Sequence, residues 1–404
     1  MKITTGDSVH PDVGAAAEEA WLHICLAFQA EPNFEPKLLI CHANADYDAA
    51  LLQQALLKLI PETCQLAGSS SCLGAMNEAG FHVADGAGLS LMVFAEDEGD
   101  FGVGLVRQDG ASEQAAVEAL VQAIADAGRP GELPSLIWMN ASPGQEEALL
   151  QGIASVVGSH VPVVGGSSAD NEIKGEWWQF SKQTCTQNGV LLIAFYPDCA
   201  IDLSFHSGYA PTPHVGIVTK AEGRIVYTID HQPAAEVYNQ WTQGSISSKL
   251  AGGNILQDST FSPLGVEAGT VEGAPYFAMK HPEQVLDDGA MRLFSNVERG
   301  EKLTLMEGSR DSLTRRAGTV IGGLMARKGW AQEQVAGALI VYCAGCMLGV
   351  REHMLDVHQG IRSVLGDTPF QAVFTFGEQG CFIDGVNRHG NLLISAILFV
   401  NEEA

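Results

Sequence analysis

An internal repeat at an offset of 98 residues constrains the fold of this chain more than any other feature of its sequence. Three blocks of the first copy return in the second copy in the same order: Leu38-Leu39 as Leu136-Ile137, Ala50-Leu51-Leu52 as Ala148-Leu149-Leu150, and Ala67-Gly68-Ser69-Ser70 as Gly165-Gly166-Ser167-Ser168. Each copy has the order apolar strand, helix, short strand, glycine-serine turn, polar connection and apolar strand. The repeat units therefore cover about residues 36–110 and 134–208.

This order of elements predicts a mixed α/β fold in which helices pack on layered sheets. Apolar residues at three- and four-residue spacing, Leu52, Leu56 and Leu59, indicate the helix of the first unit. We expect an N-terminal domain over residues 21–208, built by internal duplication about a pseudo-two-fold axis. From Tyr209 onward the pattern changes and indicates a second α+β domain over residues 209–404. Residues 1–20 are expected to be a loosely attached end.

The charge balance disfavours several classes of partner. Of the 404 residues, 46% are apolar and 17% are charged, which is typical of a folded protein. The 22 basic and 48 acidic residues give a net charge of 22 − 48 = −26, which repels nucleic acid and anionic membranes. No bilayer-spanning apolar run and no secretory signal are visible, and nine cysteines without an export signal favour a reducing compartment. We expect a cytoplasmic protein that binds neither nucleic acid nor membrane.

The two glycine-serine turns are the first candidate ligand site. Glycine allows close backbone approach, and consecutive backbone N–H groups with hydroxyls can hold a carboxylate or phosphate. Two polar residues directly after the second turn could bind an ammonium or hydroxyl group. The candidate residues are Gly68, Ser69, Ser70, Gly165, Gly166, Ser167, Ser168, Asp170 and Asn171. Alternatively, both turns are tight connections capped by serine. Neither matches a Walker loop or the dinucleotide-binding G-x-G-x-x-G pattern.

A second candidate lies in the C-terminal domain, where a glycine-flanked carboxylate ends a predicted strand. Gly377, Glu378 and Gln379 follow the strand that runs to Phe376. Such a carboxylate can bind a cationic group of a ligand, or it can fix a loop by hydrogen bonds. We expect a small-molecule pocket between the repeated turns and this loop.

Cys343 and Cys346 form a C-x-x-C motif between a predicted strand and a predicted helix. A helix N-terminus lowers a thiol pKa, so redox sensing or thiol oxidoreductase chemistry is one interpretation. The other is that both are small buried residues at a tight strand-helix junction. No second Cys/His pair has the spacing of a zinc site.

His358 shares an apolar helix face with Met354, Leu355 and Ile361. It could ligate haem iron, or it could be a hydrogen-bonded core histidine. His206, His214 and His231 near the domain junction are alternative ligands. No C-x-x-C-H motif is present for covalent haem attachment, and no G-x-S-x-G or H-E-x-x-H motif indicates a hydrolase or metalloprotease.

In this order, the motifs resemble those of the FIST family of signal-sensing proteins, with its N-terminal and C-terminal FIST domains. The likeness covers about residues 30 to 400. One departure is visible at Thr212-Pro213-His214-Val215-Gly216, where many members have an Arg-Pro-Ile-Gly-like segment. The segments that carry the likeness are Val163–Asp170, Pro213, Val218–Lys220, Val226-Tyr227, Pro233–Tyr238, Pro263–Val266, Cys343–Cys346 and Phe376–Glu378.

The resemblance implies a cytosolic sensory module, not an enzyme, which binds small ligands such as amino acids and passes the signal to a partner protein. Some bacterial members with this layout are haem-binding nitric-oxide sensors that act on histidine kinases. The segments Cys343–Met347 and Gly377–Gly380 are similar to theirs. No motif fixes a haem ligand, so haem-based sensing is the alternative expectation.

Overall fold

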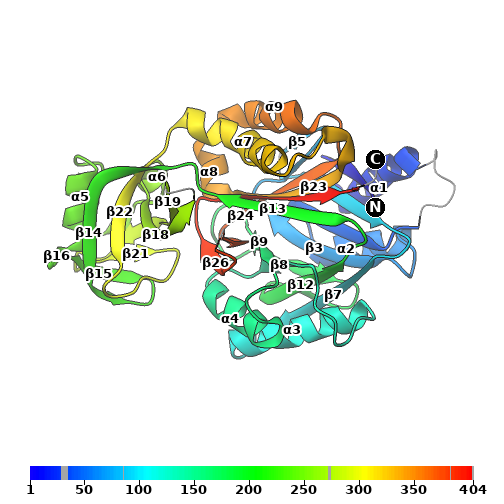
Figure 1. Cartoon of the computed structure of the whole chain (residues 1–404), viewed down its shortest axis with the longest axis horizontal. Coiled ribbons are helices and arrows are strands. Elements are labelled where there is room, and N and C mark those ends of the chain that lie inside the picture. The colour runs from blue at the N-terminus through cyan, green and yellow to red at the C-terminus, as the bar shows by residue number, and fades with distance from the viewer. Residues whose placement is uncertain (29–34, 85, 272–273, 383, 403–404) are drawn as a thin grey trace.

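Three related units, one more than the sequence repeat indicates, surround a common centre in the computed structural model (Figure 1). The structure describes residues 1–28, 35–84, 86–271, 274–382 and 384–402. Each unit runs strand, helix, strand, helix, strand, hairpin, strand. A separate lobe is inserted into the third unit.

The units share this order of elements. The first comprises β1 (Lys2–Ser8), α1 (Val13–Phe28), β2 (Leu38–Asn44), α2 (Ala49–Leu59), β3 (Gln65–Ser71), β4 (Ala75–Asn77), β5 (Gly80–His82) and β6 (Leu89–Ala95). The second comprises β7 (Asp100–Arg107), α3 (Ser112–Asp126), β8 (Leu136–Ala141), α4 (Glu146–Val157), β9 (Val163–Ser167), β10 (Gln179–Ser181), β11 (Cys185–Thr186) and β12 (Gly189–Tyr196). The third comprises β13 (Ala200–His206), α7 (Arg310–Lys328), η2 (Gln332–Gln334), β23 (Val335–Cys343), α8 (Ala344–Gly349), η3 (Arg351–His353), α9 (Met354–Leu365), β24 (Phe370–Thr375), β25 (Glu378–Cys381), β26 (Asn387–Gly390) and β27 (Ile394–Val400).

Each unit completes its six-stranded sheet with a hairpin from another unit. The strand orders are β1-β6-β2-β3-β10-β11, β7-β12-β8-β9-β25-β26 and β13-β27-β23-β24-β4-β5. In every sheet one pair of neighbouring strands is parallel, namely β2 with β3, β8 with β9 and β23 with β24. The hairpins are therefore exchanged in a closed cycle, so that no unit is complete without the other two.

The ends of β3, β9 and β24 meet at the centre of this cycle. The backbone N–H of Cys72 donates to Phe374 O at 3.1 Å, that of Ala169 to Ser70 O at 3.3 Å, and that of Phe376 to Ser167 O at 3.1 Å. These three hydrogen bonds join the units cyclically. They make Ser70, Ser167 and Phe374 equivalent positions of the three units.

The apolar core follows from the alternation of side chains along the strands. The inward faces of all three sheets contribute to one buried cluster, which includes Phe94, Phe195 and Phe399. The outward faces are covered by α1 and α2 on the first sheet, α3 and α4 on the second, and α7 and α9 on the third (Figure 1). We call residues 1–206 and 310–402 the body.

Residues 209–308 form the inserted lobe, at the left of Figure 1, with a nine-stranded sheet and its own apolar core. Val218, Tyr238 and Leu303 are fully buried there. Its elements are β14 (Ala210–Glu222), β15 (Ile225–Ile229), β16 (Gln232–Pro233), α5 (Ala234–Trp241), η1 (Ser247–Lys249), β17 (Gly253–Asn254), α6 (Leu256–Ser259), β18 (Leu264–Val271), β19 (Ala274–Lys280), β20 (Pro282–Val285), β21 (Met291–Leu293) and β22 (Lys302–Glu307).

The prediction of a mixed α/β fold with layered sheets and helices is confirmed. The expectation of a pseudo-two-fold pair was wrong, because the third unit returns after the lobe and closes the cycle. The predicted C-terminal domain, 209–404, comprises the lobe and most of that unit. The expectation of a loose end at residues 1–20 was also wrong: β1 pairs with β6 along its length, and α1 packs its buried alanines against that sheet.

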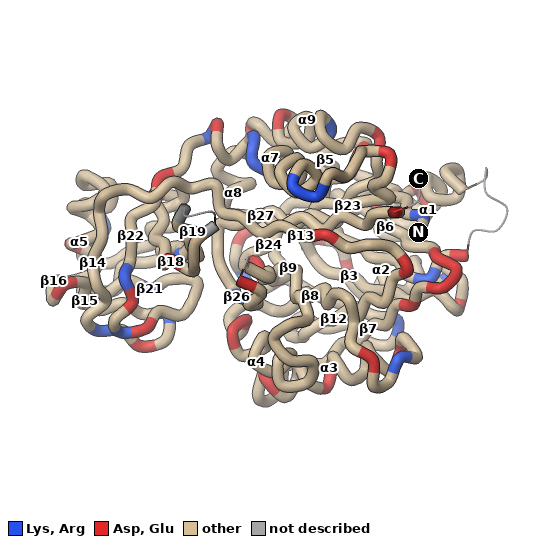
Figure 2. The backbone as a smooth tube through the Cα atoms, viewed as in Figure 1, with Lys and Arg blue, Asp and Glu red and all other residues tan. Residues whose placement is uncertain are grey.

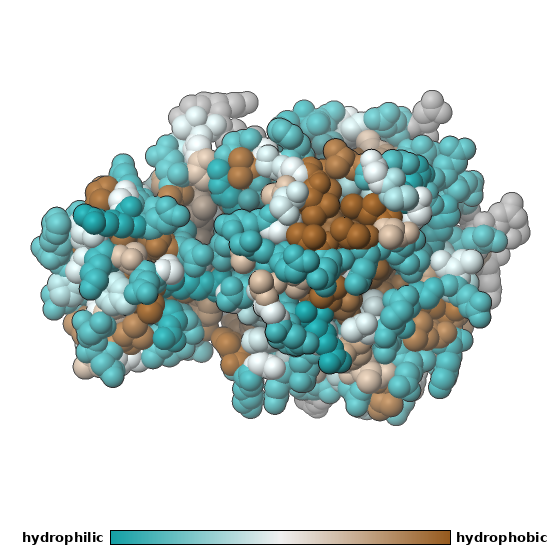
Figure 3. Space-filling model, turned by 90° about the horizontal axis from the view of Figure 1, so that it is seen from below, coloured by the Kyte–Doolittle hydropathy of each residue, from teal (hydrophilic) through white to brown (hydrophobic). Residues whose placement is uncertain are grey.

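Acidic residues are spread over both the body and the lobe, so the negative charge is not confined to one part (Figure 2). Seen from below, most of the surface is hydrophilic, and the largest of several apolar patches lies on the body (Figure 3). Within the described residues, no helix is long and apolar enough to cross a membrane. The cytoplasmic location stays a prediction.

Candidate functional site

A cavity of about 350 Å³ lies where the second unit, the third unit and the inserted lobe meet. Its walls are mostly apolar, with three aromatic side chains and a small number of polar groups, as in many small-molecule sites. The lining residues are Pro143, Gly144, Glu146, Ile173 and Trp177 from the second unit; Arg224, Leu256, His281, Glu283, Arg292, Leu293 and Phe294 from the lobe; and Cys343, Gly345, Leu348, Phe376 and Asn391 from the third unit.

An ion-pair cluster at one edge of the cavity joins the lobe to the body. Arg224 Nη2, on the turn between β14 and β15, lies 2.7 Å from Glu146 Oε2 and 3.0 Å from Glu147 Oε2, at the start of α4. Ser167 donates to Glu146 Oε1 at 2.7 Å, and His389 Nδ1 lies 3.1 Å from Glu147 Oε1. The arginine thus holds two glutamates of a different part of the chain.

These contacts decide the charge of the two carboxyl groups. Burial opposes ionisation of Glu146, but His389 and Arg224 outweigh it and lower its pKa. Burial also opposes ionisation of Glu147, but His389 and Arg224 hold its pKa well below its usual range. The ligand atoms of Glu146, Glu147 and His389 lie within 4.8 Å of one another, as a metal site would require. Because the Arg224 guanidinium already bonds both carboxylates, the cation of this cluster is the arginine.

His281 and Asn391 supply polar groups to the mainly apolar walls. The backbone N–H of His281 donates to Asn391 Oδ1 at 3.3 Å. Burial lowers the pKa of His281 to about 4, so the ring is neutral. Its Nε2 lies 3.2 Å from Leu256 O and therefore carries the proton. Asn391 Nδ2 is buried and has no hydrogen-bond partner among the described residues.

Cys343 lines the cavity, whereas Cys346 is fully buried and its Sγ lies 3.6 Å from the Tyr209 hydroxyl oxygen. Burial raises the pKa of the Cys343 thiol well above its usual value. This is opposite to the lowered pKa that the position at a helix N-terminus predicts. A raised pKa disfavours the thiolate that redox chemistry needs.

We expect Cys343 and Cys346 to be slow to alkylate in the folded protein. At pH 8, iodoacetamide should modify them at least about tenfold more slowly than the half-buried Cys185, because reaction requires an accessible thiolate. Peptide mass spectrometry after timed quenching measures each site. Unfolding in urea should equalise the three rates. Equal rates in the folded protein would restore the case for a reactive pair.

Two family models match nearly the whole chain: the FIST N domain matches residues 37–232 and the FIST C domain matches residues 234–381. The chain belongs to the FIST family. The prediction from sequence motifs is therefore confirmed. The cavity of this FIST protein is built jointly, because Glu146 and Trp177 fall in the FIST N match and His281 and Cys343 in the FIST C match.

A 90-residue segment, 22% of this FIST chain, is 32% identical to the uncharacterized protein MJ1623 of Methanocaldococcus jannaschii. The chain spans about a fifth of that relative's length, since the match covers 18% of it. Among solved structures, the crystal structure of cyanuric acid hydrolase from A. caulinodans aligns over 99% of both chains, with 10% identity and a TM-score of 0.39. An identity and a TM-score this low support no conclusion about activity.

The glycine-serine residues of this FIST protein lie beside the cavity and do not form its wall. They end the strands β3 and β9 and are hydrogen-bonded at the centre. Ser69 Oγ lies 2.8 Å from Ser168 Oγ, and Ser70 Oγ accepts from the backbone N–H of Trp178 at 3.0 Å. Ser167 holds Glu146, as described above. The glycines provide space: a Cβ on Gly68 would lie 2.2 Å from the Phe180 ring, and one on Gly165 would lie 1.9 Å from Met139 O.

Asp170 and Asn171 shape the cavity indirectly. Asp170 accepts hydrogen bonds from the backbone N–H groups of residues 172–176, and this loop carries Ile173, which lines the cavity. Asn171 accepts from the backbone N–H of Leu73 at 2.7 Å and donates to Asn44 Oδ1 at 2.9 Å. Both side chains therefore fix the loop that leads into Trp177.

The Gly377–Gln379 segment also lies next to the cavity rather than in it. Glu378 is fully buried, and burial raises its pKa well above the usual value. Its carboxyl group accepts hydrogen bonds from Thr375 Oγ1 at 3.0 Å and from the backbone N–H of Leu393 at 3.2 Å. Gln379 Nε2 lies 3.4 Å from Ser167 Oγ. A Cβ on Gly377 would lie 2.7 Å from His389 Nε2, so glycine lets the histidine approach.

The candidate haem ligands do not converge on one place. His358 lies on α9. Its Nε2 is 3.2 Å from Glu78 O, and its ring centroid is 6.1 Å from that of Phe370. His206 Nδ1 accepts from the backbone N–H of Gly208. His214 stacks on Trp241 in the lobe, and His231 is exposed. None of these four histidines lines the cavity, so none of them could ligate a haem bound there.

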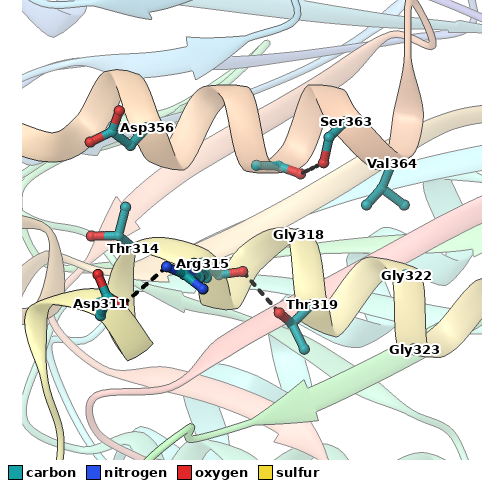
Figure 4. A pocket seen from close by; sticks show the side chains of 11 residues that line it. Asp311, Thr314, Arg315, Gly318, Thr319, Gly322, Gly323, Asp356, Ser363 and Val364 are labelled. Carbon is teal, nitrogen blue, oxygen red and sulfur yellow. Dashed lines mark hydrogen bonds and ion pairs between the residues drawn. The ribbon is translucent and has the colours of Figure 1, made fainter.

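A wider surface groove of about 720 Å³ runs between α7 and α9 (Figure 4). Its floor is formed by glycines such as Gly318 and Gly360, and its rim carries short polar side chains and the Arg315–Asp311 ion pair at 3.1 Å. Both charged side chains of this pair are exposed. Because the groove contains no buried titratable group among its lining residues, the cavity at the lobe is the stronger site candidate.

Most residues of the cavity wall, including Trp177, His281 and Asn391, are not among the candidates that the sequence motifs indicate. No local motif connects them, because Trp177 lies in the loop before β10, His281 lies between β19 and β20, and Asn391 lies between β26 and β27. The one usable signal is the acidic pair Glu146-Glu147, which directly precedes the apolar helix residues 148–150 of the second repeat unit.

Proposed function

We propose that this FIST protein is a sensor that binds a small ligand in the cavity between the body and the inserted lobe. FIST domains are sensory domains of signal transduction that are believed to bind small ligands. The observation that carries the proposal is the cavity itself: it is aromatic-lined, has several buried polar groups, and is shared by the two family domains. Its volume, about 350 Å³, lies in the range of small-molecule sites.

The position of the cavity also supports a way to transmit binding. Lobe and body both contribute to its walls, and the Arg224 cluster ties them together at its edge. A ligand that contacts both parts stabilises one arrangement of the lobe relative to the body. In our proposal a partner protein reads that arrangement, and the family resemblance makes a histidine kinase the partner class to try first.

We further propose that the protein acts by binding and not by catalysis. Two buried ionisable groups at the cavity have structural partners: Glu146 is held by Arg224, and His281 donates to a backbone carbonyl. The Cys343 thiol is held protonated by burial. The non-enzymatic proposal therefore rests on groups that are engaged in the fold.

Thermal shift tests ligand binding. A panel of amino acids, small carboxylates and neutral aromatic amides should contain at least one compound that raises Tm, since a ligand at a hundredfold excess over Kd adds about 2.7 kcal/mol of stability. Gly345→Ala should weaken its binding, because the new Cβ would project into the cavity 3.5 Å from Cys343 Sγ and 3.6 Å from His281 Cε1, without a clash.

Gly323→Ala is the matched control. It makes the same helical substitution in α7, where a Cβ would meet nothing within 4 Å. Binding should be unchanged in this variant. A panel with no shift at all, or a ligand whose affinity Gly345→Ala leaves untouched, would contradict the proposed site.

A further inference from the structure

We infer that the cavity takes a neutral, largely apolar molecule that carries an amide or lactam group, with its carbonyl oxygen on Asn391 and its N–H on His281. This inference rests on the proposed function, because it names the ligand class of the same cavity. It differs from the amino-acid ligand that the family resemblance implies.

The hydrogen-bond donor that the protein offers to the ligand is Asn391 Nδ2, as the orientation of this amide shows. The backbone N–H of His281 can only donate, so Asn391 must turn its Oδ1 toward it. Nδ2 then remains, and it has no partner among the described residues although Asn391 is only 2% exposed. A buried donor left unpaired is costly, whereas a ligand oxygen in the cavity would satisfy it.

The acceptor is the second nitrogen of the His281 ring. Since Nε2 carries the proton that points to Leu256 O, the neutral ring keeps a lone pair on Nδ1. The backbone N–H of His281 binds Asn391 Oδ1, and both residues line the cavity. A ligand with an N–H group beside a carbonyl group offers a donor for His281 Nδ1 and an acceptor for Asn391 Nδ2, whereas a carboxylate offers no donor.

The charges around the cavity favour a neutral ligand. The lining residues include two acids, Glu146 and Glu283, and two bases, Arg224 and Arg292. Arg224 is already bound to Glu146 and Glu147. Most of the remaining wall is apolar or aromatic, including Trp177 and Phe376, whose rings lie 6.3 Å apart edge to face. Arg292 is exposed, so solvent and salt screen its attraction for a ligand carboxylate. A charged ligand would lose hydration at the buried part of the wall, where Arg224 is already paired.

Four probes of similar size separate these contributions: toluene, acetophenone, benzamide and benzoate. Toluene has no polar group, acetophenone only accepts, benzamide accepts and donates, and benzoate is charged. Calorimetric titration of the full chain should give benzamide about tenfold tighter binding than toluene, with acetophenone between them and benzoate the weakest.

Two variants assign the contacts. Asn391→Ala should lower the affinities for benzamide and acetophenone to nearly that for toluene. His281→Phe should lower the affinity for benzamide to nearly that for acetophenone. Toluene affinity should hold in both variants, which shows that the cavity is intact. If a variant does not fold, the order of the four affinities in the wild-type protein still tests the inference.

The outcomes separate the two proposals. If benzoate or toluene bound as tightly as benzamide, the amide assignment would be overturned. The proposal that the cavity binds a small ligand would still stand. Gly345→Ala, which narrows the same cavity, should weaken all four probes. If none of the four bound, both the amide assignment and the proposed site would be contradicted.

Discussion

Arg224→Met is expected to lower the free energy of unfolding by about 3 kcal/mol. The substitution leaves the buried Glu146 and its neighbour Glu147 without the guanidinium that both carboxylates contact. Removal of one partner of a buried ion pair costs about 3–5 kcal/mol, and Arg224 and Glu147 retain some solvent exposure, which places the effect at the lower end. Urea unfolding followed by circular dichroism measures it.

The pH dependence identifies the cause. Both glutamates have pKa values below the ordinary 4.5 in the folded protein. Their contribution to stability is therefore present above about pH 4.5 and is lost as the pH falls through the lowered values. The difference between wild type and Arg224→Met should shrink between about pH 5 and pH 2. Arg315→Met, which removes an exposed pair on α7, should change stability little at any pH. A difference that persists in acid would point to lost packing instead.

Gly166→Ala is expected to destabilise the body by about 3 kcal/mol, the upper end of the usual cost of overpacking. Gly166 lies in β9 at the centre where the three units meet. A Cβ there would lie 2.5 Å from Thr375 Cβ and 2.4 Å from Thr375 Cγ2, in β24. Neither strand can move easily, because Ser167 and Phe376 join them through a backbone hydrogen bond. The free energy from urea unfolding is again the measurement.

A double-mutant cycle with Thr375→Gly tests the collision. In that background Gly166→Ala should cost much less than in the wild type, since the opposing Cβ is gone, while Thr375→Ser should give no such relief. Gly323→Ala, with open space around its Cβ, is the control for the substitution itself. Additive effects of Gly166→Ala and Thr375→Gly would show that the crossing of β9 and β24 is looser than described.

The sequence was sufficient to predict two of the three units, but not the third. In the structure the first two units have Gly68 and Gly165, and Ser70 and Ser167, at equivalent positions, so the offset at these turns is 97 residues (165 − 68 = 97) and not the 98 of the sequence repeat. In the third unit the position equivalent to these serines is Phe374, and the lobe separates β13 from α7 by about a hundred residues. The third unit therefore keeps the backbone pattern of the repeat without its side chains, and a search for repeated residues cannot find it.

The site was predicted only in part, for a physical reason. The motif residues Ser167, Asp170 and Glu378 do form hydrogen bonds at strand ends, as their chemistry indicated. Their partners, however, are other parts of the protein. The cavity wall comes from Trp177 and His281, which are far apart in the chain and meet only because the lobe packs on the body. Pairings of this kind depend on the tertiary arrangement, which spacing along the sequence does not contain.

The closed exchange of hairpins also affects how the chain can reach its native state. The first sheet needs β10 and β11 from the second unit, the second needs β25 and β26 from the third, and the third needs β4 and β5 from the first. A growing chain therefore exposes unpaired strand edges until its last hairpin has been made, and contacts between Met1 and Asn401 form later still. Such long-range closure makes folding slow and all-or-none across the body, and it makes partly synthesised chains dependent on protection from aggregation.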